Sequence, residues 1–361
     1  MKLLDRYIGG VVVTGTLVAL VVLVGLDIFF NVIDEIDNVG KGSYTLSVML
    51  QSVLLTTPQS LYELFPLAVL LGSLMGLGTM ANHAELVAMR ACGLSVWRIV
   101  RSVLQAGLLM LVVAVFIGEV IAPIAERHGQ NLRAQATERG VSFLGSRGLW
   151  VRDDNHYINA GKVLGRQRLA DLTVYEFDAE RQLRVATRAA QAEFSGGQWT
   201  LKNVQQSVFV GQGVSITHED SVVWPSLLTP ELLGIVQLKP KNMSAADIGQ
   251  LVDYLDENGL DTEEYRYAFW GRFMTPLSSL VMLFISVPFV FGSLRSVGAG
   301  QRIFFGMLIG FSFYIFSQLI SQLGQVYGMH PLLAMLLPIS LFMFYGCLLY
   351  TSDAADEGVE V

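Results

Sequence analysis

The residue types that do chemistry in enzymes are present in this sequence, but not in recognisable catalytic patterns. It contains no GxxxxGK[ST] phosphate loop, no HExxH or CxxC motif and no GxSxG nucleophile motif. The 5 histidines are scattered, at His83, His128, His156, His218 and His330. A serine nucleophile in the middle of the chain stays open, although no serine is paired with a histidine and an acid in a recognisable way. The sequence therefore favours a non-enzymatic protein with no metal ion or cofactor of its own.

One short polar interruption between two long apolar runs is the best candidate for a functional element. Residues 76–95 read GLGTMANHAELVAMRACGLS. As a helix, AELVAMRA places Glu85, Ala88 and Met89 on one face. A short amphipathic element of this kind can dock into a cleft of a cytoplasmic partner, and a simple solvated turn is the alternative. Because the chain has no phosphate loop, any ATP-driven motor that acts on this loop must be a separate protein.

The composition indicates that these residues belong to a protein that crosses a membrane several times. Of the 361 residues, 52% are hydrophobic and only 15% are charged. A bilayer core needs about 20 mostly apolar residues per helix. The windows that qualify are residues 8–26, 64–82, 102–118, 273–294, 303–329 and 331–352. We therefore predict six transmembrane helices in two groups of three.

The middle of the chain, at about residues 126–266, has a different hydrophobic period. Short β-branched and aromatic runs, such as LTVYEF at residues 172–177 and WTLKNV at residues 199–204, alternate with glycine-rich turn signals. This pattern is typical of a β-sandwich or jelly roll. Beyond the strands, Ser244 is expected to cap a helix that runs to about Glu257. The predicted fold is a membrane α-helical protein with an inserted all-β domain: six transmembrane helices (3+3) plus a periplasmic β-jelly roll.

Lysine and arginine in the short loops predict the orientation. A cytoplasmic N-terminus places the following residues in the cytoplasm: Lys2, Arg6, Arg90, Arg98, Arg101, Arg295 and Arg302. Only Lys41 then lies in a short outer loop, and the insert faces outward, which in a bacterium is the periplasm. The 2 cysteines, Cys92 and Cys347, both lie outside the insert, so no disulfide framework is expected.

The predicted domain limits follow from these patterns. Residues 1–124 hold the first three membrane helices and a cytoplasmic loop helix at about residues 82–93. Residues 125–260 hold the β-domain and a helical linker, and residues 261–350 hold the last three membrane helices. The tail at residues 351–361, TSDAADEGVEV, is acidic where the positive-inside rule expects basic residues, and it resembles translated sequencing-adapter sequence. The tail therefore carries no part of the prediction.

Two smaller patterns lie within the membrane helices. Gly72 and Gly76 have GxxxG spacing, and Gly306 and Gly310 repeat it, so we expect these glycines at helix contacts, with lipid, the same chain or a second subunit left open. Three acids, Asp27, Glu63 and Glu119, lie ~30 Å above the cytoplasmic ends of their helices by helix rise. They mark either the outer membrane boundary or the lining of a polar cavity.

At residues 76–95 the sequence resembles the coupling-helix region of the LptF/LptG permease family, the membrane subunits of the ATP-driven lipopolysaccharide exporter. Further matching runs are DRYIG (5–9), GKGSY (40–44), IAP (121–123), NLRAQA (131–136), GLW (148–150), LTPELLG (228–234), PLSSLVM (276–282), FGSLRSV (291–297) and VYGMHP (326–331). Together they reach over nearly the whole chain. The match is closer to the G-type than to the F-type members of the family.

The resemblance implies a non-catalytic permease subunit of an ABC transporter that extracts lipopolysaccharide from the Gram-negative inner membrane. Its implied partners are an LptF-like permease, a cytoplasmic LptB-like ATPase dimer that binds ATP and Mg²⁺, an LptC-like single-span protein and an LptA-like periplasmic bridge, with no nucleic acid among them. The two permeases would enclose an outward-opening cavity that takes lipopolysaccharide from the outer leaflet. ATP-driven closure would then expel it into the jelly roll.

The resemblance also implies roles for individual residues. Glu85 matches the coupling-helix glutamate of the family, whose carboxylate would pair with a basic residue of the ATPase. The implied ATPase-coupling residues are Glu85, Leu86, Met89 and Arg90. Arg133 falls in the NLRAQA run at the cavity mouth, where a guanidinium can bind a phosphate through two hydrogen bonds. An exposed linker arginine is the alternative for Arg133.

The sequence departs from the family at the outer end of the first span. Family members can carry lysines there for cargo phosphates, but Asn31, Asp37 and Asn38 occupy the corresponding positions here. By charge and estimated height, the candidate lipopolysaccharide-binding residues of this chain are Lys41, Arg133 and Arg272.

Two other functions were weighed against the exporter. A permease of a lipoprotein-releasing or mechanotransmission ABC system is a related possibility, but such permeases typically have four spans. A membrane-anchored β-domain that acts as a receptor or scaffold explains the insert, but it explains neither six spans nor the docking loop.

Overall fold

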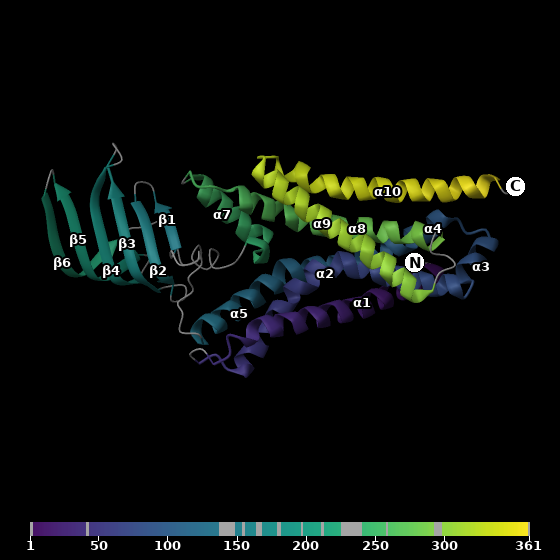
Figure 1. Cartoon of the computed structure of the whole chain (residues 1–361), viewed down its shortest axis with the longest axis horizontal. Helices are drawn as coiled ribbons and strands as arrows, with labels where there is room; N and C mark the ends of the chain where they lie inside the picture. Colours follow the sequence, from purple (N-terminus) through teal and green to yellow (C-terminus); the bar gives the residue numbers. More distant parts are fainter. Residues whose placement is uncertain are drawn as a thin grey trace. The chain divides into compact units, whose positions relative to one another are not determined.

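The computed structural model describes residues 3–40, 43–136, 149–153, 156–163, 168–178, 182–195, 198–210, 213–224, 240–257, 259–291 and 298–359 (Figure 1). The chain forms two compact units, here called the helical unit and the insert unit. The helical unit comprises Met1–Ile33, Thr56–Pro123 and Arg266–Val361. The insert unit comprises Asp34–Leu55 and Ile124–Tyr265. The insert unit thus takes in Asp34–Leu55, which the predicted limits above assigned to the membrane helices.

Six helical stretches of the described chain are long and apolar enough to cross a membrane, as predicted. They are α1 (Leu3–Ile36), α2 (Leu46–Asn82), the stretch Val96–Arg133, α8 (Glu263–Phe291), the stretch Gly300–Val326 within α9 (Ala299–Val326), and the stretch Pro331–Leu349 within α10 (Pro331–Val359). The third stretch is built from α4 (Val96–Phe116), the π-helix η1 (Ile117–Ile121) and most of α5 (Ala122–Ala136).

The second span is longer than its apolar window. It is one helix, α2, of 37 residues with Pro58 and Pro66 inside it. Of its most apolar 18-residue window, 67% is buried within the chain, compared with 11% for the stretch Gly300–Val326. The helix α2 therefore lies at the centre of the helical unit, and α9 leaves most of its apolar surface to lipid or to another protein.

The insert unit contains one antiparallel sheet of six strands that pair in chain order. The strands are β1 (Leu149–Asp153), β2 (His156–Val163), β3 (Arg168–Phe177), β4 (Leu183–Ser195), β5 (Gln198–Val210) and β6 (Gly213–Trp224). One face buries a cluster that includes Ile158, Leu172 and Trp199, because alternate residues of a strand point to the same side. The predicted all-β insert is confirmed.

The strand order differs from that of a complete jelly roll. In the described residues each strand pairs with its neighbour in sequence, which is a meander, and the Greek-key crossings of a two-sheet jelly roll are not seen there. Consecutive strands are separated by only a few residues, and strands that are close in sequence tend to pair with each other. Short alternating runs predict strands, but they do not predict which strands pair.

A helix follows the sheet, as predicted. The helix α7 (Ala245–Glu257) begins after Ser244, whose hydroxyl accepts a hydrogen bond from the backbone N–H of Asp247 at 3.1 Å. The Ser244 hydroxyl donates in turn to the Asp247 carboxylate at 2.7 Å. The first of these bonds satisfies one of the backbone donors that the first turn would leave open. Tyr254 of α7 packs against the buried face of the sheet, so the helix belongs to the same unit.

Candidate functional site

The loop singled out in the sequence forms a short helix, α3 (Glu85–Ala91), between α2 and α4. The backbone turns sharply at both ends, with Ala84 at φ 59° and Gly93 at φ +83°. Beyond the helix, the backbone N–H of Leu94 donates to the carbonyl of Met89 at 3.2 Å. A positive φ at Gly93 together with this bond resembles a left-handed C-terminal cap, which satisfies carbonyls at the end of a helix. The loop is thus an ordered helical element rather than a simple turn.

The side chains of α3 divide between the core and the surface. Leu86 is 2% exposed and belongs to the core of the helical unit, and Met89 packs against the same core. Val87 is 44% exposed, and Ala88 is also exposed. The face predicted from Glu85, Ala88 and Met89 is therefore split, because Met89 turns inward. Leu86 and Met89 anchor the helix to its own chain. The outer face is formed around the predicted Ala88 and around Val87, which the sequence reasoning did not single out.

Glu85, the predicted coupling residue, is held by the first span. The hydroxyl of Tyr7 on α1 donates a hydrogen bond to Glu85 Oε2 at 2.8 Å. A neutral phenol fixes the direction of the carboxylate without cancelling its charge. The carboxylate of Glu85 is therefore oriented by α1. Sequence reasoning assigned no role to Tyr7, although it lies within the matching run DRYIG.

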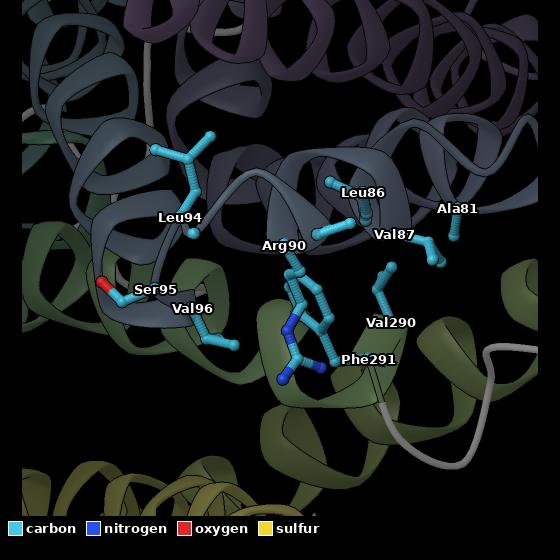
Figure 2. A pocket seen from close by; sticks show the side chains of 11 residues that line it. Ala81, Leu86, Val87, Arg90, Leu94, Ser95, Val96, Val290 and Phe291 are labelled. Carbon is cyan, nitrogen blue, oxygen red and sulfur yellow. The ribbon is translucent and has the colours of Figure 1, made fainter.

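A pocket of about 510 Å³ opens beside α3 (Figure 2). Its lining comes from α3 and its flanking residues and from the end of α8: Ala81, Leu86, Val87, Arg90, Ala91, Gly93, Leu94, Ser95, Val96, Val290 and Phe291. Figure 2 shows Arg90 reaching from α3 on the side of the pocket where Phe291 lies. Arg90 is the charged member of this otherwise apolar or small lining. The predicted coupling residues Leu86 and Arg90 thus line the same pocket.

Arg302, near the start of α9, is hydrogen-bonded to Asn82, the last residue of α2 before the α3 loop. Arg302 is 1% exposed, and its Nη2 donates to Asn82 Oδ1 at 2.7 Å. The side chain of Arg302 crosses Gly78 of α2, where an added Cβ would lie 2.4 Å from Arg302 Nη1. The end of α2 is therefore tied to the second group of membrane helices. The sequence reasoning used Arg302 only as a cytoplasmic charge.

The predicted helix-packing glycines lie at close contacts within the chain. A Cβ on Gly72 would lie 2.3 Å from the backbone of Thr16, and one on Gly76 would lie 2.9 Å from the carbonyl oxygen of Val11. On α9, a Cβ on Gly306 would lie 2.7 Å from Leu74, and one on Gly310 would lie 2.3 Å from Leu67. These glycines let α1 and α9 approach the central helix α2.

Of the two predicted cargo residues that fall within the insert unit, only Arg133 can be placed. Lys41 falls outside the described residues. Arg133 on α5 pairs with Glu35 of α1, with 3.1 Å between Arg133 Nη2 and Glu35 Oε1. The Arg133 side chain is 39% exposed, so water and ligands can reach it.

Arg272 lies in the helical unit, where it is 6% exposed. Its Nη1 lies 3.7 Å from Glu119 Oε1 and donates to the carbonyl of Gly118 at 3.3 Å. The guanidinium also lies 5.5 Å from the ring centre of Tyr62, whose hydroxyl donates to the backbone carbonyl of Arg272 at 2.8 Å. Glu119 and Gly118 belong to η1, a π-helical turn of the kind that often occurs at functional sites. The network joins α2, η1 and α8.

The other two acids of the predicted outer level have neutral partners. Asp27 accepts a hydrogen bond from the side-chain amide of Asn31 at 2.8 Å, and Glu63 accepts one from Gln59 at 2.8 Å. Glu119 lies 3.7 Å from the guanidinium of Arg272, as described above. Within the part of the chain that the structure describes, no three His, Cys, Asp or Glu side chains are grouped to hold a metal ion.

Comparisons with known proteins agree with this arrangement. Residues 6–352 match the protein family described as lipopolysaccharide export system permease LptF/LptG. The lipopolysaccharide export system permease protein LptG of Haemophilus influenzae is 34% identical over 342 residues, which cover 94% of this chain and 96% of that protein. The LptG protein of Escherichia coli K12 is also 34% identical over 342 residues, with 94% and 95% covered.

The matched region begins near the start of α1 and ends at residue 352, so it includes all six spans, the docking loop and the inserted sheet. With six spans and a match of this extent, the chain belongs to the LptF/LptG family of lipopolysaccharide export system permeases, transmembrane ABC-transporter subunits without a catalytic domain of their own.

Proposed function

We propose that this chain is the G-type half of a transporter that extracts lipopolysaccharide from the bacterial inner membrane and passes it outward. Its partners in this proposal are an LptF-like permease, a cytoplasmic LptB-like ATPase dimer, an LptC-like single-span protein and an LptA-like periplasmic bridge. The ATPase supplies the binding of ATP and Mg²⁺. The similarity to LptG proteins along nearly their whole length supports this assembly.

The observation that best supports the coupling role is that α3 is fixed to its own chain on one side and exposed on the other. The buried Leu86 fixes the helix to its own bundle, while Glu85 is oriented by Tyr7 and Val87 faces outward. A short helix that is fixed on one side and exposed on the other can transmit a push from a partner without folding away. We assign Glu85 and Arg90 to charged contacts with the ATPase, and Leu86 and Met89 to the support of the helix.

The proposed orientation places the N-terminus and α3 in the cytoplasm and the sheet in the periplasm. An even number of crossings separates the start of α1 from α3, so both lie on the same side of the membrane. The short-loop arginines, among them Arg90, Arg98 and Arg101, favour the cytoplasm for that side. The sheet follows a third crossing and therefore lies on the opposite side.

The proposed cargo contacts are Lys41, Arg133 and Arg272, which would bind the phosphate groups of lipopolysaccharide by charge-assisted hydrogen bonds. Arg133 is the strongest member of this set, because its guanidinium is partly exposed and its ion pair is partly solvated. Arg272 is instead buried against Glu119, so its role needs a separate test.

Replacing Glu85 tests the coupling role. In cells that express the chain with its candidate partners, Glu85→Ala should leave membrane insertion and pairing with the second permease intact. It should lower copurification of the ATPase, or export per ATP hydrolysed, about tenfold, because a charge-assisted hydrogen bond is lost. His83→Ala, in the same loop, is the control and should behave as the unchanged protein.

Two results would contradict the proposal. Export at the normal rate by the Glu85→Ala protein would remove the role assigned to Glu85. Failure of the unchanged chain to recruit any ATPase would contradict the transporter assembly itself.

A further inference from the structure

We propose that Glu35 is an internal competitor for cargo: it occupies the guanidinium of Arg133 until a lipopolysaccharide phosphate displaces it. The inference rests on the proposed function, in which Arg133 contacts the cargo. The proposal adds Glu35 to the site of Arg133. Glu35 is negatively charged, whereas the proposed cargo-binding residues are positively charged. Glu35 would therefore weaken cargo binding and set how readily cargo is taken up and released.

The first observation is the ion pair. Arg133 Nη2 lies 3.1 Å from Glu35 Oε1, and the two side chains are 39% and 16% exposed. A guanidinium binds a carboxylate and a phosphate through the same geometry of parallel N–H donors. The carboxylate of Glu35 therefore lies where a phosphate oxygen would have to lie.

The second observation is that Glu35 is held in place by other groups. Its Oε2 accepts hydrogen bonds from the hydroxyl of Tyr44 at 3.2 Å and from the side-chain amide of Asn38 at 3.2 Å. Tyr44 is only 1% exposed, and its hydroxyl also lies 3.0 Å from Ser52 Oγ. A carboxylate with these partners stays hydrogen-bonded and oriented when Arg133 leaves it, so exchange does not leave a buried polar group without a partner.

The third observation is that the segment bearing Tyr44 is tied to α5 itself. The backbone N–H of Ser43 donates to the carbonyl of Ala136 at 2.7 Å, and the Ser43 hydroxyl lies 3.1 Å from the same oxygen. The backbone N–H of Gly40 donates to the carbonyl of Tyr44 at 3.0 Å. These backbone bonds hold the segment near Glu35 against α5, which bears Arg133. The contact between Glu35 and Arg133 therefore does not depend on the two side chains alone.

The energetic balance favours exchange over a permanent pair. Ion pairs with this much exposure contribute little to stability, because water screens the attraction and ordering the side chains is unfavourable. A phosphate carries more charge than a carboxylate and offers three acceptor oxygens. A phosphate on Arg133 would also repel the Glu35 carboxylate if both stayed in contact. Binding of cargo therefore requires Glu35 to be displaced, and the presence of Glu35 lowers the apparent affinity.

The test is equilibrium binding of a phosphorylated lipid to the whole purified complex. The probe is bis-phosphoryl lipid A, with lipid A lacking both phosphates as the comparison. Glu35→Gln should tighten binding of bis-phosphoryl lipid A by about fivefold, since the competing charge is removed while the side-chain shape is kept. Binding of the phosphate-free lipid should not change.

Matched variants separate competition from other effects. Asp34→Asn removes the same charge from an exposed neighbour and should shift the affinity much less than Glu35→Gln. Arg133→Gln should weaken binding, and the double variant Glu35→Gln with Arg133→Gln should equal Arg133→Gln alone, because Glu35 acts only through Arg133. Inorganic phosphate alone should not displace the lipid, which identifies a lipid head group as the ligand.

The competing outcomes are distinct. If Glu35→Gln leaves the affinity unchanged or weakens it while Arg133→Gln weakens it, the competition is wrong and the cargo role of Arg133 stands. If Arg133→Gln has no effect, the cargo role itself is wrong. Should Glu35→Gln reduce folding, Glu35→Asp keeps the charge but shortens its reach. It should tighten binding less than Glu35→Gln does, and weaker binding by both variants would overturn the proposal.

Discussion

At the scale of single residues, Arg133 and Arg272 show how differently two cations of similar predicted height can be placed. Arg133 is partly exposed in an ion pair with Glu35, whereas Arg272 is buried against Glu119 and Tyr62. A buried guanidinium needs a counter-charge, because burial of an unpaired ion is strongly unfavourable. Glu119 supplies that counter-charge from η1.

A double-mutant cycle distinguishes a cargo role from a structural role for Arg272. Arg272→Gln should lower the thermal stability of the complex, because it leaves the Glu119 carboxylate without its cation. Adding Glu119→Gln should restore part of the stability, with a coupling of about 0.5–3 kcal/mol between the two sites. Lys41→Gln serves as a control that removes an equal charge elsewhere in the cargo set.

Cargo crosslinking completes this test. If Arg272 binds cargo directly, crosslinking falls in both the single and the double variant. If it acts only through Glu119, the double variant regains crosslinking together with stability. Equal crosslinking in a protein that lacks Lys41, Arg133 and Arg272 together would contradict the entire predicted cargo set.

The sequence could predict Glu85 and Arg90 as members of a docking loop, because both lie within a short polar run. It could not predict the contacts that orient them. Tyr7 reaches Glu85 across 78 positions of the sequence, and Arg302 reaches Asn82 across 220. Such pairs depend on how the helices pack. A hydrophobic pattern predicts where a helix lies and how long it is, but it does not predict which helices pack against each other.

At the scale of helices and strands, α2 is the element on which the docking loop depends. Its glycines bring α1 and α9 close, and its last turn is held by Arg302 over Gly78. In the proposed coupling, a push on α3 would reach α1 through Glu85 and Tyr7, and α9 through Asn82 and Arg302. This is a physical route from the loop to both groups of membrane helices.

Gly78→Ala tests that route. The added methyl would overlap Arg302, so the guanidinium must move, at a cost of about 1–3 kcal/mol in the free energy of unfolding. We expect lower thermal stability and less lipopolysaccharide released per ATP hydrolysed. Gly10→Ala, on α1 where a Cβ meets nothing within 4 Å, is the matched control and should keep full stability. Equal behaviour of the two variants would contradict the role of the Arg302 contact.

Local patterns predicted the strands and the cap of α7 well, because alternation and the Ser244 side chain act over a few residues. The order of the strands in the sheet could not be predicted from these local patterns. A jelly roll and a meander can contain the same strands, and the difference lies in pairings that are set by register and turn geometry. The continuity of α2 through Pro58 and Pro66 was likewise set by packing on both sides rather than by local propensity.

At the scale of the whole molecule, the number of spans and the inserted sheet separate the possible functions. Lipoprotein-releasing and mechanotransmission permeases typically have four spans, and a scaffold with one β-domain has no need of six. The family match over residues 6–352 decides against both alternatives. It also ends close to the point where the acidic tail, residues 351–361, departs from the family pattern.

The outer surface of the helical unit is rich in exposed apolar side chains. α1 and α9 leave large apolar side chains exposed, such as Val21 at 73% and Phe311 at 61%. Lipid covers such a surface in a membrane, and a second permease can cover part of it. A half-transporter that must enclose a cavity with a partner needs apolar helices of this kind on its outside.

The most direct test of the central claim is reconstitution of the chain with an LptF-like permease and an LptB-like ATPase in lipid vesicles. The account predicts that lipopolysaccharide moves from the vesicle membrane to an added LptA-like acceptor only when all three proteins and ATP with Mg²⁺ are present. It also predicts that Glu85→Ala lowers this transfer about tenfold without removing the chain from the membrane. Undiminished transfer in vesicles that lack this chain, or in vesicles without ATP, would contradict it.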